Sequence, residues 1–138
     1  MRLIVDTNRI IAALVKDSVS RRIILHLDAE LISIDFSFQE IEKHKQELLE
    51  KMRISLSEFN LLLEALKSHL VMLDDAVVQQ KMNEAKNIMD HIDPDDAPFV
   101  AAAIATKAEI WSDDAHFRKQ KKIKVWTTSE MMKRLWSR

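Results

Sequence analysis

The sequence predicts an α/β fold in which a mainly parallel central sheet is covered by helices on both faces. Short apolar runs alternate along the chain with longer segments whose apolar residues recur at helical spacing. Strands that alternate with helices in this way are typical of a parallel sheet. The chain has 138 residues, 47% of them hydrophobic, which is enough for one packed core. We therefore expect a single domain over residues 1–138.

The expected strands are short apolar runs rich in β-branched or aromatic residues. Most are followed by Asp, Ser or Thr, residue types that favour turns and helix starts. The five expected strands are 3–5, 31–34, 71–73, 109–112 and 124–127.

Helices are expected between these strands, beginning where Asp6, Thr7 and Asn8 offer N-cap side chains before an apolar periodic segment. Pro98 lacks an N–H group, which is tolerated only in a first helical turn, so a later helix should begin near Asp95 or Asp96. The other expected helices cover 20–28, 37–52, a segment from a cap at Ser55 or Ser57 to about residue 70, 76–90, a short turn near Phe117, and a last helix capped by Thr128 or Ser129 with Met131, Met132, Leu135 and Trp136 on its apolar side.

The composition excludes several classes of site. There is no glycine, so the glycine-rich phosphate loops of nucleotide-binding proteins are excluded. There is no cysteine, which excludes disulfides, cysteine-ligated zinc and thiol nucleophiles, and fits a reducing cytoplasm. Any phosphate chemistry must therefore depend on a metal ion or on polar side chains.

The chain shows no sign of export or membrane insertion. Only the apolar run 3–5 precedes Asp6, and the apolar runs IIAALV and FVAAAIA are far too short to span a bilayer. We expect a cytoplasmic protein. The net charge of −1 gives no overall attraction to nucleic acid, so any basic surface must be local.

Acidic residues follow the ends of several predicted strands. In open α/β sheets the ligand crevice lies beyond the carboxyl ends of the strands. Crowded carboxylates repel one another unless cations neutralise them, and hard divalent ions prefer oxygen ligands. The candidate ligands come from four segments: Asp6, Glu40 or Glu42, Asp95 or Asp96, and Asp113 or Asp114.

Each segment alone is also typical of a structural role. Asp6 is a good helix cap, the pair at 95–96 suits the positive end of a helix dipole, and the pair at 113–114 suits a turn. Glu40 and Glu42 lie in a charged run that is typical of a solvated helix face. Four such segments at strand ends nevertheless favour a shared metal site.

The order of these motifs resembles that of the PIN-domain nucleases over essentially the whole chain. The family begins with an apolar strand and Asp-Thr-Asn, here LIVDTN, and places its second acid in a stretch matched by FQEI, 38–41. Its third acid heads an alanine-rich helix, matched by DDAPFVAAAIA, and its fourth follows a strand as in SDD, 112–114, with Phe117 behind. The resemblance implies a PIN-like three-layer α/β/α sandwich and metal-dependent hydrolysis of RNA phosphodiester bonds.

The resemblance also implies ligands and partners. Mg²⁺ or Mn²⁺ would be the cofactor, and RNA the substrate. Many small members are VapC-type toxins, which implies an antitoxin protein as a partner, and the family also suggests a homodimer. By this likeness the catalytic metal ligands would be Asp6, Glu40, Asp96 and Asp114.

Several assignments within the site stay open from the sequence alone. Helix periodicity places Glu42 nearer the buried side than Glu40, whereas the family pattern selects Glu40, which we prefer. Asp113 is a candidate further ligand, and Asp95 and His44 are weaker candidates. The polar residues suited to orient the ligands are Thr7, Asn8 and Ser112.

A basic run, RKQKKIK, lies just after Asp114 in the sequence. Such a run can hold an RNA backbone without reading its bases. The residues expected in this role are Arg118, Lys119, Lys121 and Lys122. A solvated loop would have the same composition. Trp111 and Trp126 lie in predicted strands and are expected in the core.

Two other functions are compatible with acids at strand ends. A phosphotransfer domain, of receiver or aspartyl-phosphatase type, would use such acids, with Asp74-Asp75 imitating the acceptor. However, Asp6 has no acidic neighbour, and Asn8 stands where the phosphatase pattern needs an acid. The other alternative is a PIN-like interaction module without activity.

The helix expected from Ser55 carries more leucine than a one-sided helix needs. If Leu62, Leu66 and Leu70 face the core, Leu61 lies well round the helix and remains exposed. Leu61 is therefore the expected centre of a self-association surface.

Overall fold

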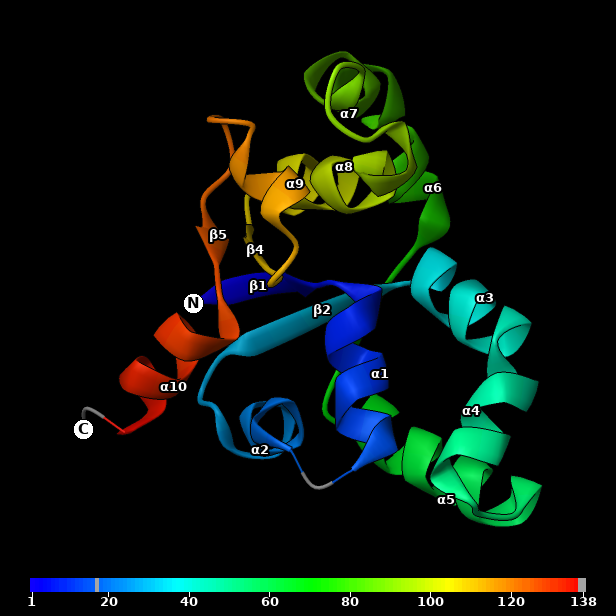
Figure 1. Ribbon diagram of the computed structural model, residues 1–138. Coiled ribbons are helices and arrows are strands. Elements are labelled where there is room, and N and C mark those ends of the chain that lie inside the picture. Colours follow the sequence, from blue (N-terminus) through cyan, green and yellow to red (C-terminus); the bar gives the residue numbers. More distant parts are fainter. Residues whose placement is uncertain (17, 137–138) are drawn as a thin grey trace.

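The computed structural model describes residues 1–16 and 18–136 of the chain. At its centre is a sheet of five parallel strands in the order β3-β2-β1-β4-β5 (Figure 1). The predicted α/β class is confirmed, and each expected strand is found within one residue at either end. The strands are β1 Arg2–Val5, β2 Glu30–Ile34, β3 Val71–Leu73, β4 Glu109–Trp111 and β5 Val125–Trp126.

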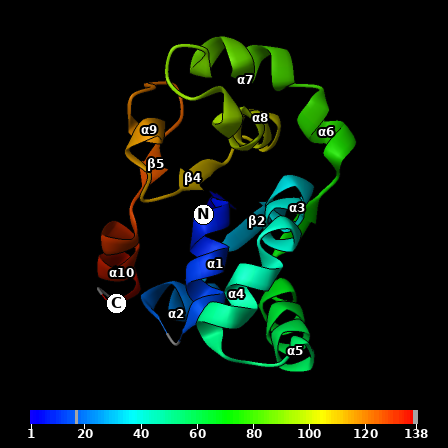
Figure 2. The same ribbon diagram turned by 45° about the vertical axis from the view of Figure 1, so that its right-hand side comes forward.

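Helices cover both faces of the sheet, as expected for a parallel sheet. Side chains alternate along a strand, so Leu3 and Val5 of β1 contact one helix layer and Ile4 contacts the other. The first layer contains α1 Thr7–Val15, α2 Val19–His26, α3 Asp35–Lys43, α4 Lys45–Met52, α5 Leu56–Lys67 and α10 Thr128–Trp136. The second contains α6 Asp75–Gln79, α7 Met82–Met89, the 3-10 turn η1 Pro94–Asp96, α8 Ala97–Thr106 and α9 Ala115–Arg118 (Figures 1 and 2).

Two expected helices are each divided in two. The helix expected over 37–52 is interrupted at His44, whose ψ of 9° lies outside the helical range. The charged run around His44 has no buried residue between Ile41 and Leu48, so packing does not hold the helix straight there. The helix expected over 76–90 is divided between α6 and α7.

Caps explain where several helices begin. Ser55, not Ser57, caps α5 in a reciprocal capping box with Glu58. Pro98 lies in the first turn of α8, as expected, and η1 precedes it.

The cap of α10 differs from the prediction. Thr127 caps the helix, because its hydroxyl accepts the N–H of Glu130 at 3.2 Å while Glu130 accepts the N–H of Thr127 at 3.0 Å. The predicted cap Thr128 has its hydroxyl engaged elsewhere. Met131 is buried as expected, but Met132 is exposed. The side chains of Leu135 and Trp136 lie outside the described part of the chain.

Two helices end in the left-handed conformation without glycine. Arg53 after α4 has a φ of 54°, and Lys107 after α8 has a φ of 56°. Non-glycine residues adopt this conformation at a cost of roughly 1 kcal/mol.

Among the residues that the structure describes, no helix combines the length and the apolar character needed to cross a membrane.

Candidate metal centre

Asp6 and Ser112 follow two adjacent parallel strands and therefore meet at the same sheet edge. The Asp6 backbone N–H donates to the carbonyl of Trp111 at 3.1 Å, which continues the ladder between β1 and β4 by one step. The fully buried Ser112 hydroxyl donates to Asp6 Oδ2 at 2.7 Å. Asp6 is only 5% exposed, so this contact holds a carboxylate in the interior at the carboxyl edge of the sheet.

Glu40 reaches the same edge from α3. The Thr7 hydroxyl lies 2.6 Å from Glu40 Oε1 and 2.8 Å from the hydroxyl of Ser37. Glu42, by contrast, is exposed and pairs with Lys45 at 3.2 Å. The expectation that Glu42 is nearer the buried side was wrong, because Ser37 and Ile41 form the buried side of α3 and Glu40 lies one turn from Ser37.

Asp96 lies at the end of η1, just before α8, and is half-buried. Its Oδ2 atom is buried and has no hydrogen-bond partner within residues 1–16 and 18–136. Burial, followed by the charges of Asp93, Asp114, Asp6 and Glu40, raises the pKa of Asp96 to about 7. The carboxylates of the four segments therefore lie close enough for their negative charges to raise the pKa of Asp96.

Burial also raises the pKa of the Asp6 carboxyl. The hydrogen bonds from Ser112 and from the backbone N–H of Asn8 lower it, the charge of Asp114 raises it, and the charge of Arg9 lowers it. The upward effects prevail. The centre is thus poor in positive charge from the protein itself, which favours binding of a cation.

Asp114 begins α9 and lies beside Ser112. Its backbone N–H donates to the Ser112 hydroxyl at 3.0 Å, and its Oδ1 accepts the N–H of His116 at 2.9 Å. Ser112 thereby connects Asp114 to Asp6. The turn at the end of β4 places Asp114, not its neighbour, next to the other carboxylates.

Asp93 and His116 are part of this cluster, although no motif in the sequence pointed to either residue. His116 Nδ1 lies 3.3 Å from Asp93 Oδ2 and 3.4 Å from Asp114 Oδ1. Asp93, Asp96 and His116 each present a ligand atom, and these atoms lie within 4.8 Å of one another. The sequence features that could have pointed to them are their positions: Asp93 lies three residues before Asp96, and His116 lies two residues after Asp114.

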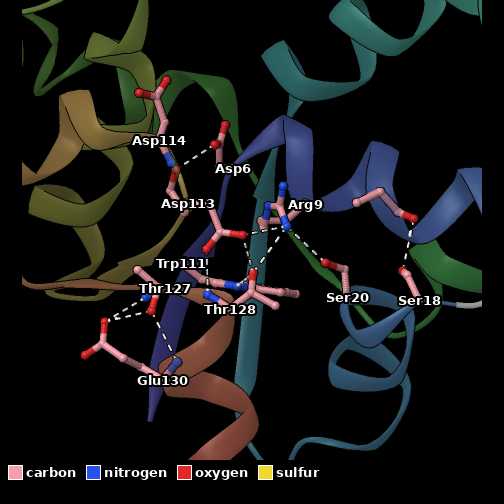
Figure 3. A network of polar contacts seen from close by, with 12 residues as sticks. Asp6, Arg9, Ser18, Ser20, Trp111, Asp113, Asp114, Thr127, Thr128 and Glu130 are labelled. Atoms are coloured by element: carbon pink, nitrogen blue, oxygen red, sulfur yellow. Dashed lines mark hydrogen bonds and ion pairs between the residues drawn. The ribbon is translucent and has the colours of Figure 1, made fainter.

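Asp113 lies in a different network, which we call the clamp and define as Arg9, Asp113 and Thr128 (Figure 3). Asp113 Oδ1 accepts the Thr128 N–H at 2.7 Å, while Oδ2 accepts the Thr128 hydroxyl at 2.7 Å and pairs with Arg9 at 2.8 Å. Arg9 also contacts Ser20, and the Trp111 indole donates to Thr128. Both oxygens of Asp113 are therefore occupied in joining α1, β4 and α10.

The weaker candidates His44 and Asp95 are not brought to Asp6, and Asn8 reaches it only through its backbone. Asn8 is exposed, although its backbone N–H binds the Asp6 carboxylate. His44 lies at the junction of α3 and α4, 3.9 Å from Glu47. Asp95 is exposed, and its N–H donates to the side chain of Asp93.

Most of the basic run 118–124 lies toward the amino edge of the sheet, whereas the carboxylates lie at its carboxyl edge. Arg118 pairs with Glu130 at 3.2 Å, but the chain must then return to the amino edge of the sheet to begin the parallel strand β5. Lys122 accordingly lines a hollow with Lys107 and Glu109, beside the amino end of β4. The role of this run in holding an RNA backbone stays a prediction.

The two tryptophans differ in burial. Trp111 is fully buried, as expected. Trp126 is half-buried, with its indole N–H donating to Glu109 at 2.9 Å and the Lys124 ammonium 4.1 Å from its ring centre.

The fold and the site together define a class of protein: an α/β/α domain with a carboxylate cluster at the carboxyl edge of its parallel sheet, suited to divalent cations. The family model of the PIN domain matches residues 4–136, so the chain belongs to the PIN-domain family. The predicted resemblance is confirmed.

A solved structure with the same fold is the crystal structure of VapBC2 from Rickettsia felis bound to a DNA fragment from their promoter. The match has a TM-score of 0.70 at 15% sequence identity and covers 92% of this chain and 98% of the other. Among curated proteins, no sequence matches significantly.

Proposed function

We propose that the protein is a metal-dependent endoribonuclease. The observation that carries the proposal is the convergence of Asp6, Glu40, Asp96 and Asp114 at one sheet edge, with a buried Asp96 oxygen that has no hydrogen-bond partner in the part of the chain that the structure describes. Buried carboxylates without a cation are unfavourable, so this arrangement fits a bound ion better than an apo structural role.

Mg²⁺ or Mn²⁺ held by these four carboxylates would activate a water molecule and neutralise charge developing on the phosphate. The neighbouring side chains hold the ligands in place: Ser112 orients Asp6 and the backbone of Asp114, and Thr7 orients Glu40. We leave Asp113 outside the ligand set, because both of its oxygens are occupied by the clamp.

Asp93 and His116 extend the donor set around Asp96. An imidazole nitrogen is a better ligand for Mn²⁺ than for Mg²⁺. The presence of His116 among the acids therefore supports Mn²⁺ as the more tightly bound ion.

An antitoxin protein is the partner that we propose. The resemblance to VapC-type toxins and the fold shared with VapBC2 support it. Co-expression of the chain with the product of its neighbouring open reading frame, followed by co-purification, tests this.

The surface around Leu61 supports self-association. Leu61 on α5 is 71% exposed and Leu56 is 50% exposed, whereas Leu66 is buried. We propose a homodimer through this face. Light scattering at micromolar concentration should give a dimer mass that Leu61→Lys converts to a monomer; a monomeric wild-type protein would refute self-association.

The phosphotransfer alternative receives little support from the geometry. Asp74 uses its side chain to cap α6 by accepting the N–H of Ala76 at 3.0 Å, so it acts as a helix cap at the β3 edge. No observation favours this function over hydrolysis.

The deciding experiment is cleavage of a labelled single-stranded RNA with Mn²⁺, with Mg²⁺ and with a chelator. We expect internal cleavage with either metal, none with chelator, and none in Asp96→Asn. Asp95→Asn is the matched control, because it removes the same charge from the exposed neighbouring position. Cleavage that is equal in Asp96→Asn and Asp95→Asn would refute the proposed site.

A further inference from the structure

The loop between α9 and β5 is held in one shape by a buried glutamine. Gln120 is 6% exposed, and its Nε2 donates to the carbonyls of Phe117 and Ile123 at 2.8 and 2.7 Å. Its Oε1 accepts the N–H groups of Lys122 and Ile123 at 3.0 and 2.9 Å. One neutral side chain thus binds four backbone groups, and the lysines of the loop point outward from a fixed backbone.

This loop forms one wall of a groove whose other wall is α7. One hollow lies between Lys119–Lys122 and the α7 side, from Glu84 to Ile92. A second hollow shares Glu84, Ile88 and Lys122 with the first and continues to the end of α8 and the start of β4. Figure 2 shows the loop after α9 beside the turn that follows α7. The groove therefore begins at Ile92, which directly precedes Asp93 of the proposed metal centre in the sequence, and runs to the amino edge of the sheet.

The groove is positively charged in a chain whose net charge is −1. In the described part of the chain, five lysines line it against the two acids Glu84 and Glu109, and no ion pair joins any of these lysines to a carboxylate. Its floor is apolar, with Ile88, Ile104 and Ile123. The lysines are Lys107, Lys119, Lys121, Lys122 and Lys124. We call this set of residues the basic groove.

We propose that the basic groove binds the phosphate backbone of the RNA strand on one side of the bond that is cleaved. The inference rests on the proposed function, because the groove starts at the residue before Asp93, toward the proposed metal centre where the reacting phosphate would lie. A strand leaving that centre along the groove meets lysine ammonium groups, which attract phosphates without reading bases, and an apolar floor that can contact the bases. This continuity with the metal centre favours RNA over an acidic protein segment.

As a consequence, the affinity for RNA should depend on how far the strand extends from the cleaved bond on the side of the groove. RNA that extends into the groove gains contacts that a trimmed RNA lacks. These contacts depend on salt and are indifferent to sequence.

Binding can be tested apart from cleavage. The probe is a fluorescein-labelled oligouridine of about 20 nucleotides, followed by anisotropy in EDTA over a range of salt concentrations. Lys121→Gln/Lys122→Gln should weaken binding about tenfold and lower the slope of log K against log salt by roughly 1.4, about 0.7 for each lost phosphate contact with a single strand. The matched control is Lys16→Gln/Lys51→Gln, which removes the same charge from exposed positions of the other helix layer and should change affinity less than twofold.

Gln120→Ala tests whether RNA binding depends on where the loop holds its lysines, as well as on their charge. It leaves the net charge unchanged but releases the backbone of the loop, so affinity should fall although no cation is lost. A thermal unfolding temperature close to wild type would show that the fold persists. In cleavage assays with Mn²⁺, the lysine variant should raise KM for the long RNA with kcat unchanged and have no effect on a trimmed RNA.

The outcomes distinguish the two proposals. Metal-dependent cleavage with equal RNA affinity in the groove variant and its control would overturn the groove and leave the nuclease intact. Absence of cleavage in the wild type, with RNA affinity still lost in the groove variants, would overturn the nuclease and support the groove. Tighter binding of a polyglutamate peptide than of the oligouridine at equal salt would overturn RNA as the occupant.

Discussion

Asp113 and Asp114 are adjacent in the sequence, yet they belong to two regions with opposite electrostatics. The clamp around Asp113 pairs its carboxylate with Arg9 and satisfies both oxygens with Thr128. The proposed metal centre around Asp114 collects Asp6, Glu40 and Asp96, and among the described residues a buried oxygen of Asp96 has no hydrogen-bond partner.

The fold therefore has one region, the clamp, that stabilises it and another, the proposed metal centre, that is suited to catalysis. In the clamp the protein supplies the cation, and the result is a connection between three elements of the first helix layer and the sheet. In the proposed metal centre, none of Asp6, Glu40, Asp96 and Asp114 forms an ion pair with a lysine or arginine among the described residues, so a bound cation would supply the balancing charge. Removing a carboxylate should therefore have opposite effects on the stability of the metal-free protein in the two regions.

The largest expected effect is on activity. Asp6→Asn should lower metal-dependent cleavage by on the order of 10³-fold, because an amide is a poor ligand for a hard divalent ion. Its carbonyl oxygen can still accept the Ser112 hydrogen bond, and one repelling anion is removed, so the unfolding temperature without metal should hold or rise. Cleavage assays and thermal unfolding on the same preparation check both parts. Near wild-type activity would remove Asp6 from the site.

The second effect is a dependence of stability on pH in the metal-free protein. An acid whose pKa is higher in the folded state binds its proton more tightly when folded. Its contribution to stability is therefore complete below the unfolded pKa and is lost as the pH rises. For Asp96, whose pKa rises from 3.8 to about 7 on folding, the stability is lost over this range of pH. The raised pKa of Asp6 acts in the same direction.

We therefore expect the unfolding temperature in EDTA to fall between about pH 4 and about pH 7. Asp96→Asn should flatten this dependence, because Asn does not titrate. Asp95→Asn should leave it as in the wild type, because Asp95 is exposed. Equal pH dependence in the two variants would show that Asp96 is not the group responsible.

The third effect concerns the clamp. Asp113→Ala removes a partner of Arg9 and two acceptors for Thr128, so it should destabilise the fold by about 1–2 kcal/mol. Cleavage at a temperature well below unfolding should stay within about tenfold of wild type, since Asp113 binds no metal in this account. Chemical denaturation of Asp113→Ala beside Asp114→Ala provides the comparison. If Asp114→Ala lost stability and Asp113→Ala did not, Asp114 would be the stabilising residue, which contradicts the roles assigned here.

The sequence was sufficient for the architecture because its signals are local. Apolar runs of three to five residues marked the strands, and Pro98 marked the first turn of α8. The family pattern selected Glu40, and in the structure Glu40 is the residue of α3 that contacts Thr7, whereas helix periodicity taken alone favoured Glu42, which is exposed.

The rest depended on tertiary geometry. Both Asp113 and Asp114 follow β4, and only the turn in which Ser112 accepts the Asp114 N–H decides which one faces Asp6. Asp93 and His116 come from segments far apart in the chain, with no periodicity to connect them. The placement of the basic run at the amino edge follows from the parallel direction of β5, which required knowing the strand order.

The most direct measurement is the change in unfolding temperature on addition of Mn²⁺ to the wild type, Asp114→Asn and Asp113→Ala. A ligand that binds only the folded state at about 100 times its Kd stabilises it by about 2.7 kcal/mol, which corresponds to several degrees. We predict a rise of this size in the wild type, an equal rise from a lower starting point in Asp113→Ala, and a much smaller rise in Asp114→Asn. No rise in the wild type, or an equal rise in Asp114→Asn, would contradict the assignment of the metal centre.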